Sequence, residues 1–358
     1  MDLQEIRSKL DQIDTEMEGL FEERMRLCAE VAEYKIQTKK AVYDPKREQE
    51  KIEALTKLAN GEFNKQAVAE LFLQMMTLSR RYQYQTMAGR LGVSSPGFQK
   101  VKKLDTQGKR VVYQGLEGAY SHAAALAYFG REAKLYHVRR FEELMVEIQE
   151  ERADFAVLPI ENSSAGAVTD SYDLLLKYSN YIVAEIFVPV SHCLLGTAEA
   201  ELSDIKRVYA HPQALKQSSE FLNRHPHWQQ FSMENNAVAA RQVREDGDSS
   251  QAAVASAIAG EIYGLKPLAE QINNSRENTT RFLILSKKPV YREDAGKVSL
   301  CFELPHKSGS LYNMLGNFIF NHVNMVMIES RPIPEHNWES CVNGVTKYTG
   351  YTVTLTMQ

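Results

Sequence analysis

An apolar repeat near the N-terminus constrains the fold more than any other feature of the sequence. The register alternates steps of three and four residues, and position 24 alone breaks it. It comprises Leu3, Ile6, Leu10, Ile13, Met17, Leu20, Leu27, Val31 and Tyr34. This spacing predicts one helix of roughly 35 residues, about 50 Å long, with a heptad seam along one face. Three helices of one chain cannot bury so long a seam, so we expect an intertwined all-helical dimer.

Changes in composition and hydrophobic periodicity along the chain predict further segments. Residues 1–88 predict two shorter helices after the long one, over about 45–59 and 65–87, with Asp44 as N-cap and Pro45 as first helical residue. Residues 89–108 are polar and aperiodic, which is typical of a linker. Residues 109–287 alternate short apolar runs with helical stretches, which predicts a mostly parallel α/β sheet in two lobes. A second linker near 288–296 and a small α+β module over 296–358 complete the prediction.

Charge and cysteine usage exclude several classes of function. The net charge of −4 offers no basic surface for nucleic acid or anionic lipid. No apolar run approaches the length of a membrane span. The cysteines, Cys28, Cys193, Cys301 and Cys341, stand far apart and form no CxxC pair. We therefore expect no nucleic-acid partner, no membrane, no metal or other cofactor, and a reducing, cytoplasmic compartment.

The break in the seam is a cation, Arg24. A buried arginine costs several kcal/mol unless an anion meets it. Two interpretations remain open: a salt bridge to a nearby acid such as Glu22 or Glu23, or a small bound anion. Lys35 lies about three turns further along the same face. Arg7 points about 100° away from Arg24 and would serve the site of a partner chain.

Further polar residues of the helical segment belong to the same pattern. Arg47 and Glu48 stand in the first turn of the second helix, and Ser79 and Gln83 share a face of the third. Taken singly, each is more typical of a solvated helix face. Together they predict a cationic pocket without a nucleophile–base pair, which suits a reaction that needs only binding and electrostatic stabilisation.

These positions resemble the active site of AroQ-class chorismate mutases. The resemblance rests on Arg7, Arg24, Lys35, Asp44, Arg47, Glu48, Ser79 and Gln83. It implies that Arg24 and Arg47 hold the carboxylates of chorismate, with Arg7 supplied by the partner chain. It also implies that Lys35 and Gln83 bond the ether oxygen as its C–O bond breaks, and that Glu48 holds the substrate hydroxyl.

Four motifs of the α/β segment place small polar residues after apolar strands. They are GLEGAYS (115–121), PIENS (159–163), HPQAL (211–215) and TRF (280–282). Each alone is more typical of an ordinary loop or helix cap. As a set over 109–287 they resemble prephenate dehydratase. That resemblance implies two α/β lobes that close over a cleft, as in periplasmic binding proteins, and a site formed by Asn162, Gln213 and Thr280, with Ser163 and Arg281 close by.

The implied chemistry suits these residue types. Prephenate loses carbon dioxide and its ring hydroxide together, and formation of the aromatic ring drives the step, so no strong base is needed. The enzyme must hold carboxylates and donate a hydrogen bond to the departing oxygen. We expect Thr280 to be that donor and Arg281 to be a cation beside it.

The C-terminal segment resembles the first half of an ACT regulatory domain, up to about residue 339. The resemblance implies phenylalanine as effector, bound by Ser308, Gly309, Ser310, Leu311, Glu329, Ser330, Arg331 and Pro332. Beyond this point only YTVTLTM (351–357) alternates like a strand. We therefore expect phenylalanine to inhibit weakly or not at all.

The sequence as a whole predicts a bifunctional enzyme that takes chorismate through prephenate to phenylpyruvate, as a homodimer or a higher homo-oligomer. The alternative is a non-catalytic two-lobed sensor that binds prephenate or phenylalanine. The polar residues retained in both candidate sites favour the enzyme.

Overall fold

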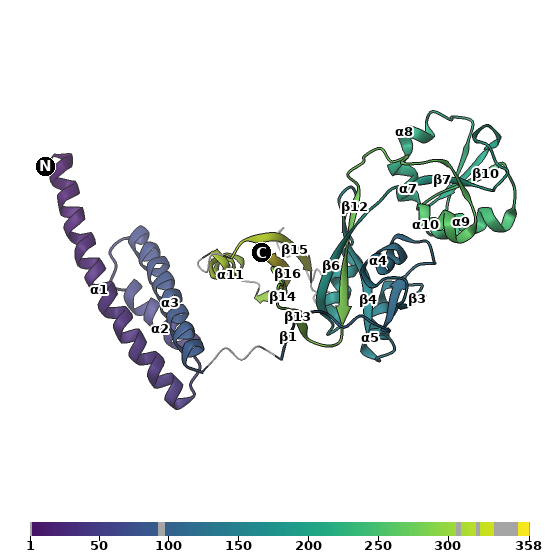
Figure 1. Ribbon diagram of the computed structural model, residues 1–358. Coiled ribbons are helices and arrows are strands. Elements are labelled where there is room, and N and C mark those ends of the chain that lie inside the picture. The colour runs from purple at the N-terminus through teal and green to yellow at the C-terminus, as the bar shows by residue number, and fades with distance from the viewer. Residues whose placement is uncertain (1, 92–96, 306–308, 320–322, 333–349, 358) are drawn as a thin grey trace, which may run out of the picture. The chain divides into compact units, whose positions relative to one another are not determined.

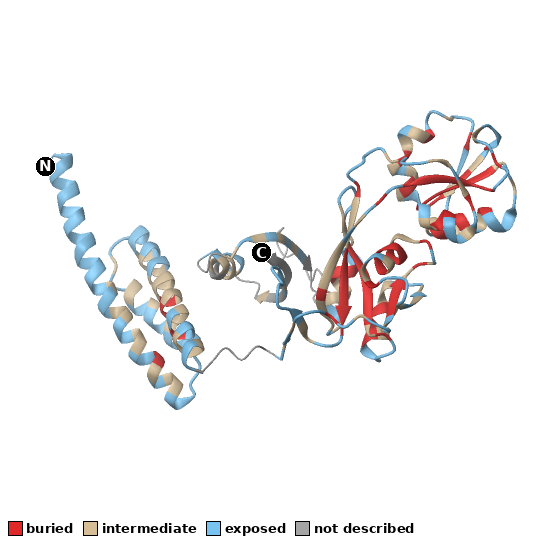
Figure 2. Cartoon of the chain, viewed as in Figure 1, coloured by how far each residue is buried: buried red, intermediate tan, exposed pale blue. Residues whose placement is uncertain are grey.

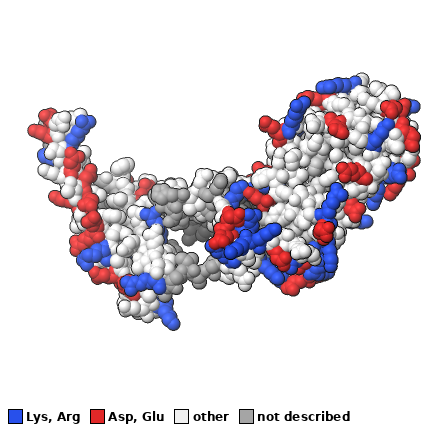
Figure 3. Space-filling model, viewed as in Figure 1, with Lys and Arg blue, Asp and Glu red and all other residues white. Residues whose placement is uncertain are grey.

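A computed structural model describes residues 2–91, 97–305, 309–319, 323–332 and 350–357 (Figure 1). The chain divides into two compact units, Met1–Gly97 and Phe98–Gln358. Acidic and basic side chains are interspersed over the face of both units seen in Figure 3. Among the described helices, none is long and apolar enough to cross a membrane.

The first unit is a set of three helices. They are α1 (Leu3–Thr38), α2 (Pro45–Thr56) and α3 (Glu62–Leu91). The long first helix is confirmed, and the other two differ from their predicted bounds by three or four residues at most ends. Asp44 caps α2 as expected, because its carboxylate accepts a hydrogen bond from the backbone N–H of Arg47 at 3.0 Å.

No described residue of the same chain covers the heptad seam of α1. All nine seam residues are exposed, from 43% for Ile6 to 67% for Leu20, and α1 is pale blue along most of its length in Figure 2. The neighbouring stripe of α1 packs on α3 instead, with Ala32 fully buried. Large apolar side chains repeated along one helix face are typical of a surface that another helix covers.

The second unit contains a first lobe around a mixed sheet with the strand order β3-β2-β4-β12-β6. Its strands are β2 (Arg110–Gln114), β3 (Lys134–Val138), β4 (Phe155–Asn162), β6 (Tyr181–Pro189) and β12 (Thr279–Ser286), and β5 (Gly166–Ala167) pairs with β4. Its helices are α4 (Tyr120–Phe129), α5 (Phe141–Gln149) and α6 (Thr169–Lys177). Apolar clusters form on the sheet, and Val112, Leu158 and Ile284 in them are fully buried.

A second lobe follows between β6 and β12. Its sheet has the order β11-β7-β10-β8-β9, built from β7 (Cys193–Gly196), β8 (Arg207–Ala210), β9 (Gln229–Ser232), β10 (Gln251–Ala255) and β11 (Lys266–Ala269). The helical elements are η1 (Leu202–Asp204), α7 (Pro212–Gln217), α8 (Ser219–Leu222), α9 (Asn236–Asp246) and α10 (Ala257–Tyr263). The two-lobed α/β architecture is therefore confirmed.

The prediction of mostly parallel sheets is wrong, because both sheets are mixed. In the first lobe β2 pairs parallel with β3 and β4, whereas β12 pairs antiparallel with β4 and β6. In the second lobe β7 pairs antiparallel with β10 and β11. The reason is topological: the chain leaves the first lobe after β6, builds the second, and returns as β12 beside the strand it left. Short apolar runs do not reveal this direction.

Parts of both stretches with linker composition are ordered strands. β1 (Gln99–Val101) pairs parallel with β13 (Val290–Arg292), and Leu104 is buried in the core of the first lobe. The C-terminal module contains β14 (Val298–Pro305), α11 (Ser310–Ile319), β15 (Met325–Pro332) and β16 (Gly350–Met357). Its strand order is β14-β16-β15, so the strand predicted over 351–357 is confirmed and lies at the centre of the sheet.

Candidate active sites

The first candidate site lies where α1 packs on α3. The Arg24 guanidinium donates from Nη1 to Ser79 Oγ at 2.5 Å and to the Met75 carbonyl oxygen at 3.3 Å. Ser79 is only 5% exposed. Arg24 thus turns from the exposed seam toward α3, and no acid among the described residues pairs with it. The salt bridge to Glu22 or Glu23 does not form, which leaves this cation available to a bound anion.

Lys35 reaches the same helix–helix interface further along. Its Nζ donates to Gln83 Oε1 at 3.2 Å and to the Val42 carbonyl oxygen at 2.6 Å. An ammonium group carries three N–H donors, so one remains for a ligand. Gln83 is 6% exposed. The predicted pairing of faces, Arg24 and Lys35 on one helix with Ser79 and Gln83 on the other, is therefore present in the structure.

Arg80 is a residue of this region that sequence reasoning missed. Its guanidinium forms an ion pair with Glu48 and donates to Thr77 Oγ1 at 2.9 Å. It also lies over the ring of Tyr43, 5.0 Å from the centroid. The signal was a second cation directly after Ser79. Its contact fixes the carboxylate of Glu48, the group predicted to hold the substrate hydroxyl.

Three predicted residues are not brought into this interface within one chain. Arg7 and Arg47 are exposed, and neither side chain has a polar partner in the described part of the chain. Asp44 is exposed as well and serves as the cap of α2. Their placement agrees with a site that is completed by another copy or by a ligand, but the described contacts do not bring them together.

The second candidate site lies at the polar ends of β4 and β12. These strands are antiparallel neighbours in which Thr280 stands opposite Asn162. Asn162 Nδ2 donates to Thr280 Oγ1 at 2.9 Å and to Asn278 Oδ1 at 2.8 Å. β12 is buried from Phe282 to Ser286 but only half-buried from Thr279 to Arg281. The hydroxyl of Thr280 thus lies at the half-buried N-terminal end of β12, as predicted.

The loop after β4 fixes the orientation of the Asn162 amide. Its Oδ1 accepts hydrogen bonds from the backbone N–H groups of Ser164 at 3.1 Å and Ala165 at 2.9 Å. Ser163 binds the other strand, because its Oγ accepts from the Thr279 N–H at 2.9 Å. Backbone amides can only donate, so the oxygen of Asn162 must face the loop and its nitrogen must face Thr280.

Gln217, rather than the predicted Gln213, reaches this cluster from the second lobe. Gln217 Nε2 lies 3.2 Å from Ser164 Oγ, and its Oε1 lies 3.1 Å from His192 Nε2. Both glutamines lie on α7, one turn apart. The side chain of Gln213 makes no hydrogen bond to the described residues. The sequence signal for Gln217 was its place four residues after Gln213 on the same helix face.

Contrary to the prediction, Arg281 does not lie beside the Thr280 hydroxyl. Its guanidinium pairs with Glu185 at 2.8 Å and approaches Glu161 at 3.9 Å. It is 11% exposed and also contacts Met327 of β15, with Nη1 3.8 Å from the sulfur. Successive residues of a strand point to opposite faces, which explains why the cation and the hydroxyl separate. Arg281 therefore links the first lobe to the C-terminal module.

The two lobes touch at the GLEGAYS turn. Gly118 has a φ of +87°, and a Cβ there would lie 2.8 Å from the Cα of Ala259 in α10. The Ser256 hydroxyl donates to the Gly118 carbonyl at 2.7 Å, and the Tyr263 hydroxyl donates to the Glu117 carbonyl at 2.9 Å. Only glycine permits both the backbone conformation and this approach.

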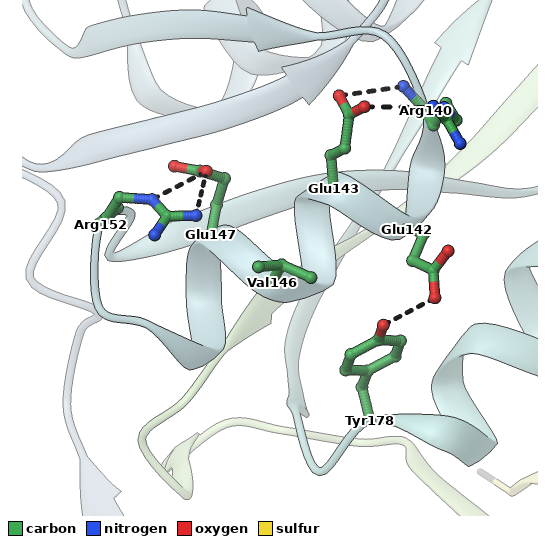
Figure 4. A pocket seen from close by; sticks show the side chains of 7 residues that line it. All are labelled: Arg140, Glu142, Glu143, Val146, Glu147, Arg152 and Tyr178. Carbon is green, nitrogen blue, oxygen red and sulfur yellow. Dashed lines mark hydrogen bonds and ion pairs between the residues drawn. The ribbon is translucent and has the colours of Figure 1, made fainter.

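A separate surface pocket does not include these residues. It has a volume of 370 Å³ and lies beside α5 (Figure 4). Its carboxylates already have partners: Glu147 pairs with Arg152 at 2.7 Å, and Glu142 accepts from the Tyr178 hydroxyl at 2.7 Å. The residues that line it are Arg140, Glu142, Glu143, Val146, Glu147, Arg152 and Tyr178. Paired surface charges of this kind offer no free group for chemistry.

The predicted effector residues fall on two elements of the C-terminal module. Gly309, with a φ of +79°, precedes α11, on which Ser310 and Leu311 occupy the first positions. The ESRP motif, Glu329, Ser330, Arg331 and Pro332, forms the end of β15. Glu329 is half-buried and Ser330 is exposed. Ser308 lies outside the described residues.

Comparisons with known proteins identify the family of both parts of the chain. The family model of chorismate mutase type II matches residues 6–84, and that of prephenate dehydratase matches residues 111–290. The bifunctional chorismate mutase/prephenate dehydratase of Escherichia coli (strain K12) is 32% identical over 341 residues, covering 93% of this chain and 86% of that protein.

Two solved structures resemble the second unit. A prephenate dehydratase from Arthrobacter aurescens in complex with L-Phe has a TM-score of 0.60 at 26% identity, covering 69% of this chain and 80% of that one. GqqA, described as a novel type of quorum quenching acylase, has a TM-score of 0.60 at 30% identity, covering 70% of this chain and 87% of that one.

The family match over residues 111–290 thus shows that the α/β unit is of the prephenate dehydratase class. With the helical unit and its cationic interface included, the chain belongs to the family of bifunctional chorismate mutase/prephenate dehydratases.

Proposed function

We propose that this chain converts chorismate to prephenate in its helical unit and prephenate to phenylpyruvate in its two-lobed unit. The observation that carries the second step is the contact between Asn162 and Thr280, which sets a hydroxyl group at the mouth of a rigid strand pair. The family membership of both units supports the two steps together.

The mutase reaction is a rearrangement within one molecule, so binding and electrostatics suffice. Arg24 and Arg47 hold the two carboxylates of chorismate. Lys35 donates its remaining N–H to the ether oxygen, which gains negative charge as its bond to carbon breaks, and Gln83 adds a second donor. The described contacts support this assignment, because Arg24 and Lys35 bind only neutral oxygens.

Arg80 adds a positioning role to this scheme. Its ion pair with Glu48 holds that carboxylate in one orientation, so that it can accept a hydrogen bond from the substrate hydroxyl. The charge of Glu48 is therefore balanced before the substrate binds.

In the dehydratase reaction the carbon–carbon bond to the ring carboxylate breaks and carbon dioxide leaves. The electron pair of that bond completes the aromatic ring, and the ring hydroxyl leaves as hydroxide, which becomes water on protonation. Thr280 donates a hydrogen bond to the departing oxygen as it gains charge. Ser163 and Asn162 hold the strand and the hydroxyl in place, and Gln213, at the entrance of α7, completes the site when the substrate is bound.

A second copy of the chain covers the seam of α1 and supplies Arg7 to the first site. The nine exposed apolar residues of one helix support this, because so long an apolar stripe is stable in water only when covered. Leu20→Glu, in the most exposed seam position, should shift the protein from dimer to monomer in sedimentation velocity and abolish mutase activity. A Leu20→Glu protein that stays dimeric with full mutase activity would contradict the intertwined arrangement.

The C-terminal module is an ACT-like domain that binds L-phenylalanine. Two observations support this: β14, α11, β15 and β16 follow in the order strand–helix–strand–strand with β16 between the other two, and the predicted contacts lie at the start of α11 and the end of β15. The Arthrobacter aurescens relative was crystallised with L-Phe. Arg281 and Met327 connect this module to the strand of Thr280.

A non-catalytic sensor is the rival function. A spectrophotometric assay for phenylpyruvate, started from chorismate alone, separates the two. The enzyme forms phenylpyruvate catalytically, whereas a sensor binds prephenate without turnover. Absence of phenylpyruvate from a folded protein that binds prephenate by calorimetry would overturn the proposed function.

A further inference from the structure

A line of polar side chains crosses from one lobe to the other and ends at Thr280. Its members, which we call the Tyr120–Thr280 chain, are Tyr120, His192, Gln217, Ser164, Asn162 and Thr280. Successive polar atoms lie between 2.9 and 3.2 Å apart. His192 stands where the chain passes from β6 into the second lobe, is 2% exposed, and has no role in the mechanism above.

The directions of the hydrogen bonds between Thr280 and Nε2 of His192 follow from two backbone amides. The N–H groups of Ser164 and Ala165 identify the oxygen of Asn162. Ser164 Oγ lies 3.1 Å from that oxygen, so the hydroxyl of Ser164 must donate to it. The same hydroxyl oxygen must then accept from Gln217, which identifies the Gln217 atom that faces it as nitrogen.

The Gln217 oxygen is thereby turned toward His192, so Nε2 of that histidine must carry a proton. No acid among the described residues bonds the imidazole, whose two nitrogens face the Tyr120 hydroxyl and Gln217 Oε1. Burial lowers the pKa of His192 below its usual value. The ring is therefore neutral with Nδ1 unprotonated, and the Tyr120 hydroxyl lies between two acceptors, His192 Nδ1 at 3.0 Å and the Ser191 carbonyl oxygen at 2.8 Å.

At the other end, Thr280 Oγ1 accepts from Asn162 Nδ2. Its own proton has no acceptor within the described ranges of the chain. From Nε2 of His192 to Thr280, each group donates a hydrogen bond to the next. The hydroxyl of Thr280 is therefore the donor that stays unused at this end, where the leaving oxygen of prephenate needs one.

We propose that His192, as the neutral tautomer with its proton on Nε2, is a positioning residue for the dehydratase reaction: it orients Gln217, and through Ser164 and Asn162 it sets the hydroxyl of Thr280 to donate. This inference rests on the proposed dehydratase function and adds a specific tautomer and an inter-lobe link to it. Because Gln217 comes from the second lobe, the chain is complete only when the two lobes are together.

Two substitutions of His192 separate orientation from simple packing. His192→Gln places an amide N–H close to the position of Nε2 and can still donate to Gln217. His192→Asn places its amide close to the position of Nδ1 and cannot. We expect His192→Asn to lower dehydratase kcat at least about tenfold, the effect of one lost buried hydrogen bond, with little change in KM. His192→Gln should retain most of kcat.

Tyr263→Phe is the matched control. It removes a tyrosine hydroxyl that also bonds across the two lobes, to the Glu117 carbonyl, but lies outside the Tyr120–Thr280 chain. Its dehydratase kcat should stay close to that of the unmodified protein. Equal losses in His192→Asn and His192→Gln, with circular dichroism showing both folded, would overturn the positioning role.

A second measurement does not depend on activity. Nitrogen-15 NMR of the full chain with labelled histidine distinguishes a protonated Nε2 with a bare Nδ1 from the other tautomer and from the imidazolium. We expect the first form at pH 7.5. Either other form would overturn the proposal. If the protein forms no phenylpyruvate while NMR shows this tautomer, the proposed function fails and the hydrogen-bond chain stands.

Discussion

The helical unit and the two-lobed unit differ in how much apolar core they bury. In the helical unit the described apolar residues that are buried are only Ala32, Val42 and Met76, while the polar Ser79 and Gln83 are equally buried. The lobes bury four apolar clusters, including strands such as β10 that are buried throughout. A single copy of the helical unit thus holds a site without a core, whereas each lobe has a core of its own.

The two proposed sites also differ in the chemical groups that they present. In the proposed mutase site, Arg24 and Lys35 have only neutral partners among the described residues, so both can act on a substrate by charge. The proposed dehydratase site presents neutral amides and hydroxyls whose orientations are fixed by one another, and Arg281, the cation predicted for it, is already paired. Charge acts over several ångströms and tolerates a site shared between chains, but a hydroxyl donor must be placed within hydrogen-bond distance by a rigid scaffold.

The largest expected effect tests whether the two sites are independent. Arg24→Ala removes the one cation that bonds α3 at Ser79 and is assigned to a substrate carboxylate. Mutase activity should fall by roughly 30- to 4,000-fold, because truncating one partner of a buried charge pair costs about 2–5 kcal/mol. Dehydratase activity on added prephenate should survive. Loss of both activities in a folded protein would show that the units are coupled.

The next effect tests the neutral site. Thr280→Val keeps the shape and strand propensity of the residue and removes its hydroxyl. We expect dehydratase kcat to fall by about 10²–10³-fold, the cost of losing one donor to a developing oxyanion, with KM nearly unchanged and mutase activity retained. Steady-state kinetics on prephenate and on chorismate measure all three quantities.

Thr279→Val is the control for that substitution. Thr279 lies on the opposite face of β12, and its side-chain hydroxyl has no partner among the described residues. Its replacement should be mild. Near-native dehydratase turnover in Thr280→Val would mean that the threonine only supports the strand and Asn162.

The contrast between the units also explains what the sequence could predict. Periodicity located α1, Asp44 as a cap, and the polar mouth of β12, because these depend on local spacing and turn chemistry. It missed the mixed sheets, since strand direction depends on a chain crossing far away in sequence. It also missed Gln217, His192 and Arg80, each of which has a partner 25 or more residues away, and it could not show that Glu185 would neutralise Arg281.

A smaller effect concerns the stability of the lobes at acidic pH. His122 Nδ1 accepts the Gly118 N–H at 3.0 Å, and His211 Nδ1 accepts the Gln213 N–H at 3.2 Å. Burial lowers the pKa of both histidines from the usual 6.5. The unfolded chain therefore binds more protons below pH 6.5, so the stability of the lobes is full above that pH and falls as the pH drops toward the folded values.

The expected loss between pH 6.5 and 5.5 is at most about 1.4 kcal/mol for the buried His122, and it is smaller for His211, which is exposed. Urea unfolding followed by the fluorescence of the buried Trp228, with Trp338 replaced by Phe, measures it. His122→Asn retains an acceptor oxygen near Nδ1 but does not titrate, so it should flatten the pH dependence. Lobes as stable at pH 5.5 as at pH 7.5 would contradict the neutral, accepting histidines.

The smallest expected effect is that of phenylalanine. The start of α11 and the end of β15 carry the predicted contacts, and Met327 of β15 lies against Arg281, next to Thr280 in the chain. A ligand shifts activity only as far as its affinity differs between two states, and the sequence beyond about residue 339 does not resemble the second half of an ACT module. We therefore expect dehydratase inhibition below about fivefold at saturating phenylalanine, under the usual range of allosteric coupling. Mutase activity should not respond.

Titration calorimetry and dehydratase kinetics on the full chain, run at the same concentrations, check this. Tight binding with inhibition at matching concentrations would show that the module is a complete effector domain, and would replace the contrast of two independent units by one of a regulated and an unregulated site.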